Sequence, residues 1–419
     1  MMSYFAVTGG TKLIGSVNIN GAKNSVLPIL AATLLNGGEN IIHNCTDLRD
    51  VESAVKILRH LGCRISRQGK TLTVDSSTIS RCDVPESLMR EMRSSVIFLG
   101  PILARCGQVR LSTPGGCELG PRPIDLHLDA LRKLGADVSL DGGEILCRVG
   151  NMRGRDIALS FPSVGATENI MLAATACTGQ TRILNAAREP EIEDLQRFLS
   201  GIGAAVRGAG SSEIYVSGTE KYRRAEHTVM PDRIEAATYL CAAAACGGYI
   251  QLENACFEHI ASVASILSDA GCDIKNDTNR VIIRSDRRLS PLPAVQTMPY
   301  PGFPTDAQSQ LMAAACLADG TTVFCENIFE NRFRQASELV RMGANIKVSG
   351  KTAVVEGVRQ LSGASVRCTD LRGGAALVIA ALAAAGESRI YDIEHIDRGY
   401  EKIELAYSSL GGIIKRKDE

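Results

Sequence analysis

The feature that most restricts the fold of this 419-residue chain is an internal repeat. A helix end, a glycine and a β-branched strand start recur six times, and successive glycines lie 68 to 73 residues apart by subtraction of their positions. The repeated glycines are Gly62, Gly135, Gly203, Gly271, Gly343 and Gly411. Glycine best tolerates the left-handed conformation in which many helices end. Each copy therefore predicts an amphipathic helix, a glycine at its C-terminal end, and then a strand.

A second signature precedes the first in each unit and consists of an Ala-rich apolar helix, a Gly turn and a short strand. Its clearest copies are IMLAATACTGQTRILNAA (170–187), YLCAAAACGGYIQLENA (239–255) and LMAAACLADGTTVFCENIF (311–329). These helices are apolar on all sides and lack bulk, so we expect them to be buried and closely packed. Each unit thus holds two helices and several strands.

Six such units predict an α/β protein with two domains of three repeats each, related by pseudo-threefold symmetry. Units of this size are too large for a solenoid of short repeats, and the chain is too long for one ordinary core. We expect domain I to comprise residues 1–22 and 231–419, because the N-terminal strand completes the last repeats. Domain II is expected to span 23–230 and to carry a loop at 113–123.

Composition argues against several classes of protein. Lys plus Arg and Asp plus Glu both number 46, so no overall field draws the chain to nucleic acid or to an anionic membrane. The N-terminus lacks a signal-peptide pattern, and the longest apolar stretch, 373–386, is shorter than the ~20 residues of a membrane span. We therefore expect a cytoplasmic protein.

The fourteen cysteines form no CxxC pair and do not stand with His at zinc-ligand spacing. Many lie in Ala-rich segments, which is typical of small core residues in a reducing compartment. No metal site is expected.

Cys117 is the exception, because it lies in an insertion, TPGGCELGPRP (113–123), where the repeat needs only a strand-to-helix connection. Three glycines and three prolines in this segment are typical of a lid. Its thiol could act as a nucleophile or as a proton donor, and either role needs a tuned pKa. The alternative is an ordinary loop with an incidental cysteine.

Six basic residues stand in polar, turn-like settings near the junctions of the units, in both halves of the chain. They are Lys23, Arg93, Arg122, Arg332, Arg372 and Arg398. Taken alone, each of these residues is interpreted as a solvated surface charge. If the two domains face each other, the set would instead line a cleft suited to a small, highly charged anion, because arginine binds phosphate and carboxylate in a bidentate way.

Two further segments open predicted helices. Asp306, in PGFPTDAQ, is either a helix-start acid favoured by the helix dipole or a general base for a substrate hydroxyl. Asp370, beside Arg372, is interpreted as an orienting partner. Ser163–Gly165 begin an Ala-rich helix whose backbone N–H groups suit a diphosphate or a carbonyl.

The motifs INGAKN, PGGCELGPRPIDLH, SVGATENIM, AAREPEIEDL, MPDRIEA, PGFPTDAQ, ENRF, TDLRGGAAL and HIDRGYEKIE run along nearly the whole chain. Together they resemble the UDP-N-acetylglucosamine 1-carboxyvinyltransferase family. The resemblance implies a two-domain inside-out α/β barrel with six βαβαββ-type repeats. It implies transfer of the enolpyruvyl group of phosphoenolpyruvate to the 3′-OH of UDP-N-acetylglucosamine, with release of phosphate from a tetrahedral intermediate, as the first committed step of peptidoglycan synthesis. It implies no metal or organic cofactor.

The same resemblance assigns roles to individual residues. Cys117 would be the proton donor, and fosfomycin would alkylate it. Lys23, Arg122 and Arg398 would hold the phosphate, and Arg332 and Arg372 the carboxylate. Asn24 and Arg93 would border both substrates. Asp306 would be the base. The residues implied to contact the UDP-sugar are Asn24, Arg93, Arg122, Pro123, Ile124, Asp125, Leu126, Ser163, Val164, Gly165, Asp306 and Ile328.

Three positions depart from the family pattern. Phe161-Pro162 stands where some members carry a Lys, and Arg334-Gln335-Ala336 replaces a usual Met-His-Val, which adds a charge near Arg332. Glu118 follows the reactive cysteine, and its charge opposes thiolate formation. None of these departures removes a matched catalytic residue.

Three other functions are alternatives to this one. They are an enolpyruvyl transferase for a different acceptor such as a shikimate phosphate, a non-catalytic regulator that binds a UDP-sugar, and a nucleic-acid end-processing enzyme. The Cys117 loop argues against the first and the intact set of charged residues against the second. The neutral charge balance and scarcity of aromatic residues argue against the third. We expect a monomer, because a cleft between two domains needs no partner.

Overall fold

The computed structural model describes residues 3–92, 94–112 and 124–418. Its described residues form two compact units, which we call unit 1 (3–20 and 231–418) and unit 2 (21–92, 94–112 and 124–230). The chain passes from unit 1 to unit 2 after Asn20 and returns after Met230. The first passage lies two residues before the boundary expected at residue 22.

Unit 1 contains three four-stranded sheets. The strands of the first sheet are, in order, β16 (Asp273–Asp277), β17 (Arg280–Ser285), β15 (Gly248–Glu253) and β2 (Leu13–Asn18). Those of the second are β18 (Val295–Gln296), β19 (Thr321–Cys325), β21 (Thr352–Glu356) and β20 (Asn345–Ser349). Those of the third are β22 (Ser365–Arg367), β23 (Glu387–Tyr391), β1 (Ser3–Thr8) and β24 (Ile413–Asp418). The helices are α8 (Arg233–Cys246), α9 (Phe257–Asp269), α10 (Thr305–Ala315), α11 (Gln335–Arg341), α12 (Leu371–Ala383), α13 (Ile403–Ser409) and the 3-10 helix η2 (Ile393–Arg398).

Unit 2 also contains three four-stranded sheets. The strands of its first sheet are, in order, β14 (Ala225–Thr228), β3 (Glu39–His43), β5 (Thr71–Asp75) and β4 (Arg64–Gln68). Those of the second are β6 (Asp83–Val84), β7 (Gln108–Ser112), β9 (Glu144–Arg148) and β8 (Asp137–Asp141). Those of the third are β10 (Asp156–Ala158), β11 (Gln180–Leu184), β13 (Glu213–Ser217) and β12 (Ala205–Arg207). The helices are α1 (Lys23–Ala32), α2 (Arg49–His60), α3 (Glu86–Glu91), α4 (Leu99–Cys106), α5 (Asp125–Lys133), α6 (Val164–Ala174), α7 (Pro190–Gly201) and the 3-10 helix η1 (Ser95–Phe98).

All six sheets share one topology, a parallel pair followed by two antiparallel pairings. In the β18 sheet, for example, β18 pairs in parallel with β19, and β19 and β20 both pair antiparallel to β21. The chain order β18-α10-β19-α11-β20-β21 is the βαβαββ repeat predicted from the sequence. The N-terminal strand β1 lies between β23 and β24 and completes the last sheet of unit 1, which confirms its expected place. The predicted α/β fold class is confirmed.

The six repeated glycines end the outer helices as predicted, with φ angles between 89° and 105°. In each copy the residue after the glycine donates its N–H to a carbonyl five residues earlier, as Cys63 does to Leu58 at 2.9 Å and Ala344 to Leu339 at 3.1 Å. This bonding satisfies the last carbonyls of the helix and turns the chain into the next strand. A left-handed glycine therefore forms the same type of helix-to-strand turn in every repeat.

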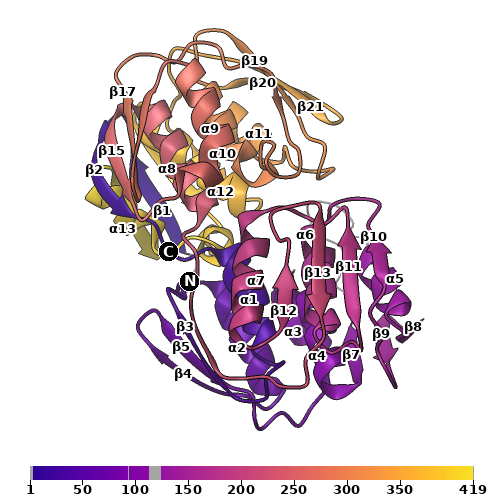
Figure 1. Cartoon of the computed structure of the whole chain (residues 1–419). Coiled ribbons are helices and arrows are strands. Elements are labelled where there is room, and N and C mark those ends of the chain that lie inside the picture. Colours follow the sequence, from indigo (N-terminus) through magenta and orange to yellow (C-terminus); the bar gives the residue numbers. More distant parts are fainter. Residues whose placement is uncertain (1–2, 93, 113–123, 419) are drawn as a thin grey trace. The chain divides into compact units, whose positions relative to one another are not determined.

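The Ala-rich helices form the centre of each unit. In unit 1, α8, α10 and α12 pack against one another, and the sheets lie outside them (Figure 1). Ala313 and Ala376 are among the alanines with no exposed surface in these helices. Small side chains let the helix axes approach closely, so a larger residue at either position would overpack the junction at a cost of about 1–3 kcal/mol. Each unit has its own hydrophobic core.

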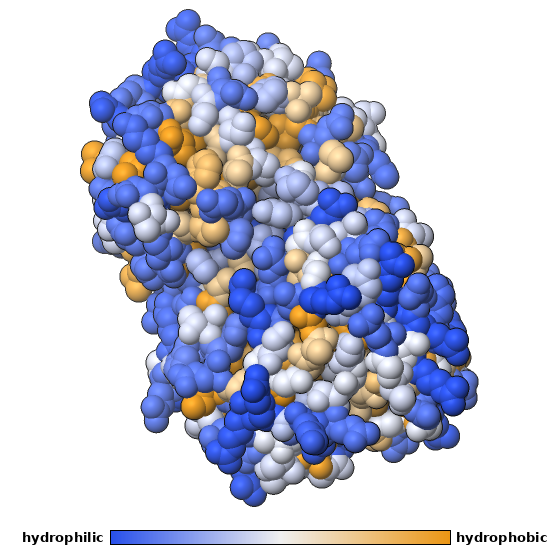
Figure 2. All heavy atoms as spheres, viewed as in Figure 1, coloured by the Kyte–Doolittle hydropathy of each residue, from blue (hydrophilic) through white to orange (hydrophobic). Residues whose placement is uncertain are grey.

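Hydrophilic residues cover most of the face visible in Figure 2, with hydrophobic residues in smaller patches between them. Within the described ranges, the chain has no helix that is both long enough and apolar enough to cross a bilayer.

Candidate active site

Several of the predicted site residues that the structure describes stand in the first turn of a central helix. Asp306 and Arg372 are the second residues of α10 and α12 in unit 1. Lys23 begins α1, and Val164 begins α6, in unit 2. The repeat brings the N-terminal ends of these helices to equivalent places, and helix starts favour anions because their first backbone N–H groups have no carbonyl partner within the helix. These four residues therefore occupy the same type of position, the start of a central helix.

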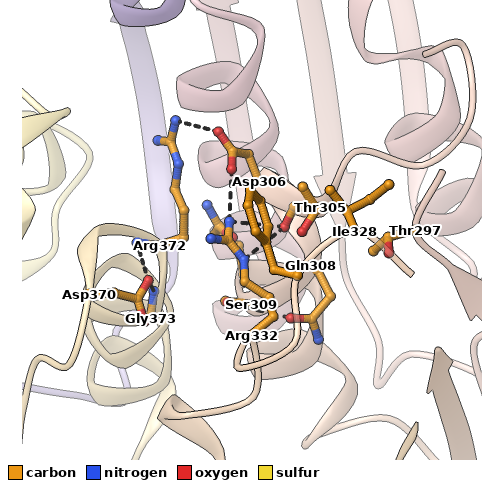
Figure 3. Close-up of polar contacts among 12 residues, drawn as sticks. Thr297, Thr305, Asp306, Gln308, Ser309, Ile328, Arg332, Asp370, Arg372 and Gly373 are labelled. Carbon is orange, nitrogen blue, oxygen red and sulfur yellow. Dashed lines mark hydrogen bonds and ion pairs between the residues drawn. The ribbon is translucent and has the colours of Figure 1, made fainter. Parts of the chain in front are cut away.

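Asp306 lies between two arginines in unit 1 (Figure 3). Its Oδ1 accepts a hydrogen bond from Nη2 of Arg332 at 2.8 Å, and its Oδ2 accepts one from Nη2 of Arg372 at 3.0 Å. Arg332 also donates from Nε and Nη2 to the carbonyl of Thr305, at 3.2 and 3.1 Å. The structure thus brings together three residues that the sequence placed far apart, and a carboxylate held by two guanidinium groups is stabilised in its ionised form.

The two arginines are buried, whereas the Asp306 side chain is about one quarter exposed (26%). Burial alone would lower the pKa of Arg372, but Asp306, Tyr400 and Asp232 together outweigh burial and the pKa is raised. The Nε atom of Arg372 has no hydrogen-bond partner among the described residues. Nε and Nη2 lie on one edge of the guanidinium group, and this edge fits the two oxygens of a carboxylate. Arg372 thus has one donor, Nε, that no described residue uses.

Asp370 caps the helix that carries Arg372. Its Oδ1 accepts hydrogen bonds from the backbone N–H groups of Arg372 and Gly373, both at 3.0 Å. The carboxylate is buried and satisfies two of the donors that a helix start leaves open. Asp370 thus orients the start of α12.

Glu326 is a site residue that the sequence analysis missed. Its buried Oε1 accepts hydrogen bonds from the Thr297 hydroxyl at 2.9 Å and from the backbone N–H of Ile328 at 2.8 Å. Its Oε2 accepts one from the Thr305 hydroxyl at 2.9 Å. One carboxylate therefore fixes both the start of α10 and the loop that carries Ile328. The available signal was an acidic residue directly after an apolar strand.

In unit 2, Lys23 forms an ion pair with Asp50 of α2, with Nζ 2.8 Å from Oδ2. The Lys23 side chain is 12% exposed and that of Asp50 only 2%. The pairing fixes the ammonium group at the start of α1, next to Asn24. Arg398 is the last residue of η2 in unit 1.

The starts of α5 and α6 carry the remaining described residues of the predicted UDP-sugar site. Ile124 caps α5, and Asp125 and Leu126 are its first residues. Ser163 caps α6 and accepts a hydrogen bond from the Ala166 N–H at 3.4 Å. A Cβ atom on Gly165 would lie 3.2 Å from Cε1 of His127, so glycine lets the imidazole of α5 pack on the first turn of α6. The two helix starts are therefore held together.

A pocket of about 200 Å³ lies between α5 and β10, and Leu126, Ala130, Ile157 and Leu159 are among its lining residues. A larger hollow, of about 540 Å³, is lined by 106–108, 135, 137 and 148–150 and contains none of the predicted site residues. Leu126 is a predicted UDP-sugar residue and lines the smaller pocket, so the smaller pocket agrees better with the predicted site than the larger hollow does.

Four of the predicted residues, Arg93, Cys117, Arg122 and Pro123, lie outside the described residues, as does the rest of the loop 113–123. The departure Arg334-Gln335-Ala336 spans the start of α11. It leaves Arg332 paired with Asp306 at 2.8 Å. Within the described ranges, no group of three or more His, Cys, Asp or Glu residues is arranged to hold a metal ion.

Asp194 of α7 holds the start of α1 against the end of the third repeat. Its Oδ2 accepts hydrogen bonds from the Ser25 hydroxyl at 2.5 Å and from the Met230 N–H at 3.1 Å. Its Oδ1 lies 3.1 Å from Nε2 of His227. Burial would raise the pKa of Asp194, but the hydrogen bonds from His227 and Ser25 outweigh it, so the pKa is lowered.

Replacing Asp194 with Asn should destabilise unit 2 by roughly 3 kcal/mol at neutral pH, because it breaks a buried charge network. The pKa of Asp194 in the folded state lies below its ordinary value of 3.8, so the carboxylate stabilises the fold fully above that pH. Its contribution is lost as the pH falls through the folded-state pKa. Amide hydrogen exchange of unit 2 at pH 7 and in acid measures the difference.

The matched control is Asp129→Asn, which removes an exposed carboxylate paired with Arg132 three residues along the same helix. It should change stability by less than ~0.5 kcal/mol. Equal protection of the Asp194→Asn variant and the wild type at pH 7 would contradict the role of Asp194.

Comparison with known proteins gives a consistent result over the whole chain. The family model for EPSP synthase (3-phosphoshikimate 1-carboxyvinyltransferase) matches residues 7–406. The UDP-N-acetylglucosamine 1-carboxyvinyltransferase 1 of Symbiobacterium thermophilum is 50% identical over 98% of this chain and 95% of its own. The UDP-N-acetylglucosamine 1-carboxyvinyltransferase 2 of Caldanaerobacter subterraneus subsp. tengcongensis is 49% identical over 99% of this chain and 100% of its own.

Among solved structures, the enolpyruvyl transferase NikO from Streptomyces tendae superimposes with a TM-score of 0.90 at 25% identity, covering 99% of both chains. An EPSP synthase from Acinetobacter baumannii superimposes with a TM-score of 0.74 at 17% identity, covering 99% of this chain and 100% of its own. The fold is thus that of the enolpyruvyl transferases, a class of transferase enzymes. The chain belongs to the UDP-N-acetylglucosamine 1-carboxyvinyltransferase family.

Proposed function

We propose that this protein transfers the enolpyruvyl group of phosphoenolpyruvate to the 3′-hydroxyl of UDP-N-acetylglucosamine and releases phosphate, as the first committed step of peptidoglycan synthesis. The observation that carries the proposal is full-length identity of about half to proteins that bear this name. The arrangement of Asp306, Arg332 and Arg372 supports it, because it pairs a candidate base with a carboxylate-binding pair of arginines.

Phosphoenolpyruvate carries a carboxylate and a phosphate, so its binding requires several cations. We assign the carboxylate to Arg332 and Arg372, whose buried guanidinium groups already hold one carboxylate, that of Asp306. We assign the phosphate to Lys23, Arg122 and Arg398. Asn24 completes the set as a hydrogen-bonding residue beside Lys23.

The proposed reaction is an addition followed by an elimination. Asp306 takes the proton of the 3′-hydroxyl, the oxygen attacks C2 of phosphoenolpyruvate, and Cys117 gives a proton to C3. Loss of the C3 proton then accompanies cleavage of the bond between C2 and the phosphate oxygen. The substrate carboxylate competes with Asp306 for the arginines, so its arrival would weaken the ion pairs of Asp306 and leave that carboxylate a better base.

The UDP-sugar is proposed to contact Asn24, Arg93 and Arg122–Leu126 as well as Ser163–Gly165, Asp306 and Ile328. The N–H groups at the start of α6 suit its diphosphate, and Glu326 holds Ile328 in place. Alkylation of Cys117 by fosfomycin, a cytoplasmic location and a monomeric state stay predictions.

The choice of acceptor tests the proposal. The protein is incubated with phosphoenolpyruvate and an equimolar mixture of UDP-N-acetylglucosamine and shikimate 3-phosphate, and the products are identified by mass spectrometry. Enolpyruvyl-UDP-N-acetylglucosamine as the product supports the proposal. A shikimate product would assign the chain to the other acceptor, and no product despite binding of the UDP-sugar would indicate a non-catalytic regulator.

A further inference from the structure

A buried group of polar residues lies where the three central helices of unit 1 meet. The group consists of Thr238 on α8, Gln310 on α10 and Arg372 on α12, all joined to Tyr400, which lies between η2 and α13. The Tyr400 hydroxyl is 2.8 Å from Oγ1 of Thr238, 3.1 Å from Nε2 of Gln310 and 3.2 Å from Nη1 of Arg372. One phenol therefore joins all three repeats of the unit.

The protons in this group have a defined direction. Arg372 can only donate, so the Tyr400 oxygen accepts from Nη1. Thr238 donates its own proton to the Ile234 carbonyl at 2.7 Å, which leaves its oxygen to accept the Tyr400 proton. The chain of donors runs from Arg372 through Tyr400 and Thr238 to the backbone of α8. Burial raises the pKa of Tyr400, which keeps the phenol neutral and able to donate.

This chain of hydrogen bonds fixes one end of the Arg372 guanidinium group. Nη1 is held by Tyr400, Nη2 reaches Asp306, and Nε is the donor without a partner among the described residues. Without the Tyr400 hydroxyl, the guanidinium group of Arg372 could rotate and turn its Nε–Nη2 edge away from a carboxylate. A side-chain hydrogen bond to a charged group contributes more than one between neutral groups.

We infer that Tyr400 is a positioning residue for phosphoenolpyruvate, which it serves by holding Arg372 in the orientation that binds the substrate carboxylate. The inference rests on the proposed function, since it takes phosphoenolpyruvate as the ligand of Arg372. Tyr400 itself touches Arg372, Thr238 and Gln310, so it acts through Arg372.

Unit 1 offers a matched control in Tyr407. Its side chain is also fully buried and stands seven residues further along, but its hydroxyl has no hydrogen-bond partner among the described residues. Tyr407→Phe and Tyr400→Phe each remove one buried oxygen atom, and only the second removes a contact to Arg372. Thr238→Val provides a second route, because it removes the acceptor of the Tyr400 proton and keeps the shape of the side chain.

The experiment measures kcat and KM for each substrate in the wild type and the three variants, together with their melting temperatures. Tyr400→Phe should lower kcat/KM for phosphoenolpyruvate by about tenfold and leave KM for UDP-N-acetylglucosamine within about twofold of the wild type. Thr238→Val should act in the same direction with a smaller effect. Tyr407→Phe should keep wild-type kinetics and an equal or higher melting temperature, because it removes a hydroxyl that is buried without a partner.

The outcomes separate the inference from the proposed function. Equal kinetics in the two Tyr→Phe variants, or a loss in Tyr400→Phe that is the same for both substrates, would overturn the inference. If Tyr400→Phe does not fold, Thr238→Val tests the inference instead. The inference is then overturned if Thr238→Val has wild-type kinetics or shows the same loss for both substrates. A wild type without UDP-sugar-dependent phosphate release would overturn the proposed function instead, and calorimetric titration with phosphoenolpyruvate then compares the variants.

Discussion

Replacing Asp306 with Asn should lower kcat by about a thousandfold, the scale of a lost general base, while phosphoenolpyruvate binds at least as tightly as before. Asn cannot take the proton of the sugar hydroxyl. It also carries no charge, so Arg332 and Arg372, which now share Asp306 at 2.8 and 3.0 Å, would be left to the substrate carboxylate. Steady-state kinetics and calorimetric titration with phosphoenolpyruvate measure the two effects separately.

The Asp306→Asn variant should also be less stable, by roughly 3 kcal/mol, since it leaves two buried guanidinium groups without a counter-charge. A suitable control is Asp319→Asn, because Asp319 is an exposed carboxylate shortly after α10 that pairs with Arg288 at 2.8 Å. The control should keep its activity. Weaker binding of phosphoenolpyruvate to Asp306→Asn would contradict the competition between the two carboxylates.

Replacing Cys117 with Ser should lower kcat by about a hundredfold or more and abolish inactivation by fosfomycin. A serine hydroxyl is a far weaker acid than a thiol and is a poor proton donor to C3. In the wild type, mass spectrometry of the fosfomycin-treated protein should find one adduct, on the peptide that contains Cys117.

Burial makes several of the other cysteines unreactive. Burial raises the pKa of Cys45, Cys63, Cys246 and Cys316 to about 12, so these thiols stay protonated at neutral pH and do not react with an epoxide. Cys82→Ser, at a partly exposed position, serves as the control and should keep both activity and sensitivity. Sensitivity to fosfomycin in Cys117→Ser would contradict the assignment.

The repeat made most of the fold predictable. Six glycines at nearly constant spacing gave the helix ends, and the structure shows all six with positive φ and the same bonding. The alanine-rich segments gave the buried helices because small apolar side chains on every face exclude a surface position. The pairing of β14 with β3 was not predicted, because it joins residues 225–228 to 40–43 and depends on how unit 2 closes.

Departures from the repeat such as Asp306 and Arg372 marked the candidate site, and their roles stay predictions. Residues that act through long-range contacts gave no such signal. Glu326 receives hydrogen bonds from Thr297 and Thr305. Tyr400 joins three helices through Thr238, Gln310 and Arg372, which lie 72 and 62 residues apart by subtraction of their positions. Such partners become visible only when the three repeats are packed together, since nothing local marks them.

The central claim is that the enolpyruvyl group passes to the UDP-sugar, and phosphate release tests it most directly. Phosphate is measured from phosphoenolpyruvate with and without UDP-N-acetylglucosamine, using the wild-type protein. The account predicts release that requires the sugar and that equals the amount of enolpyruvyl product formed. Release that does not depend on the sugar, or no release when both substrates are bound, would contradict it.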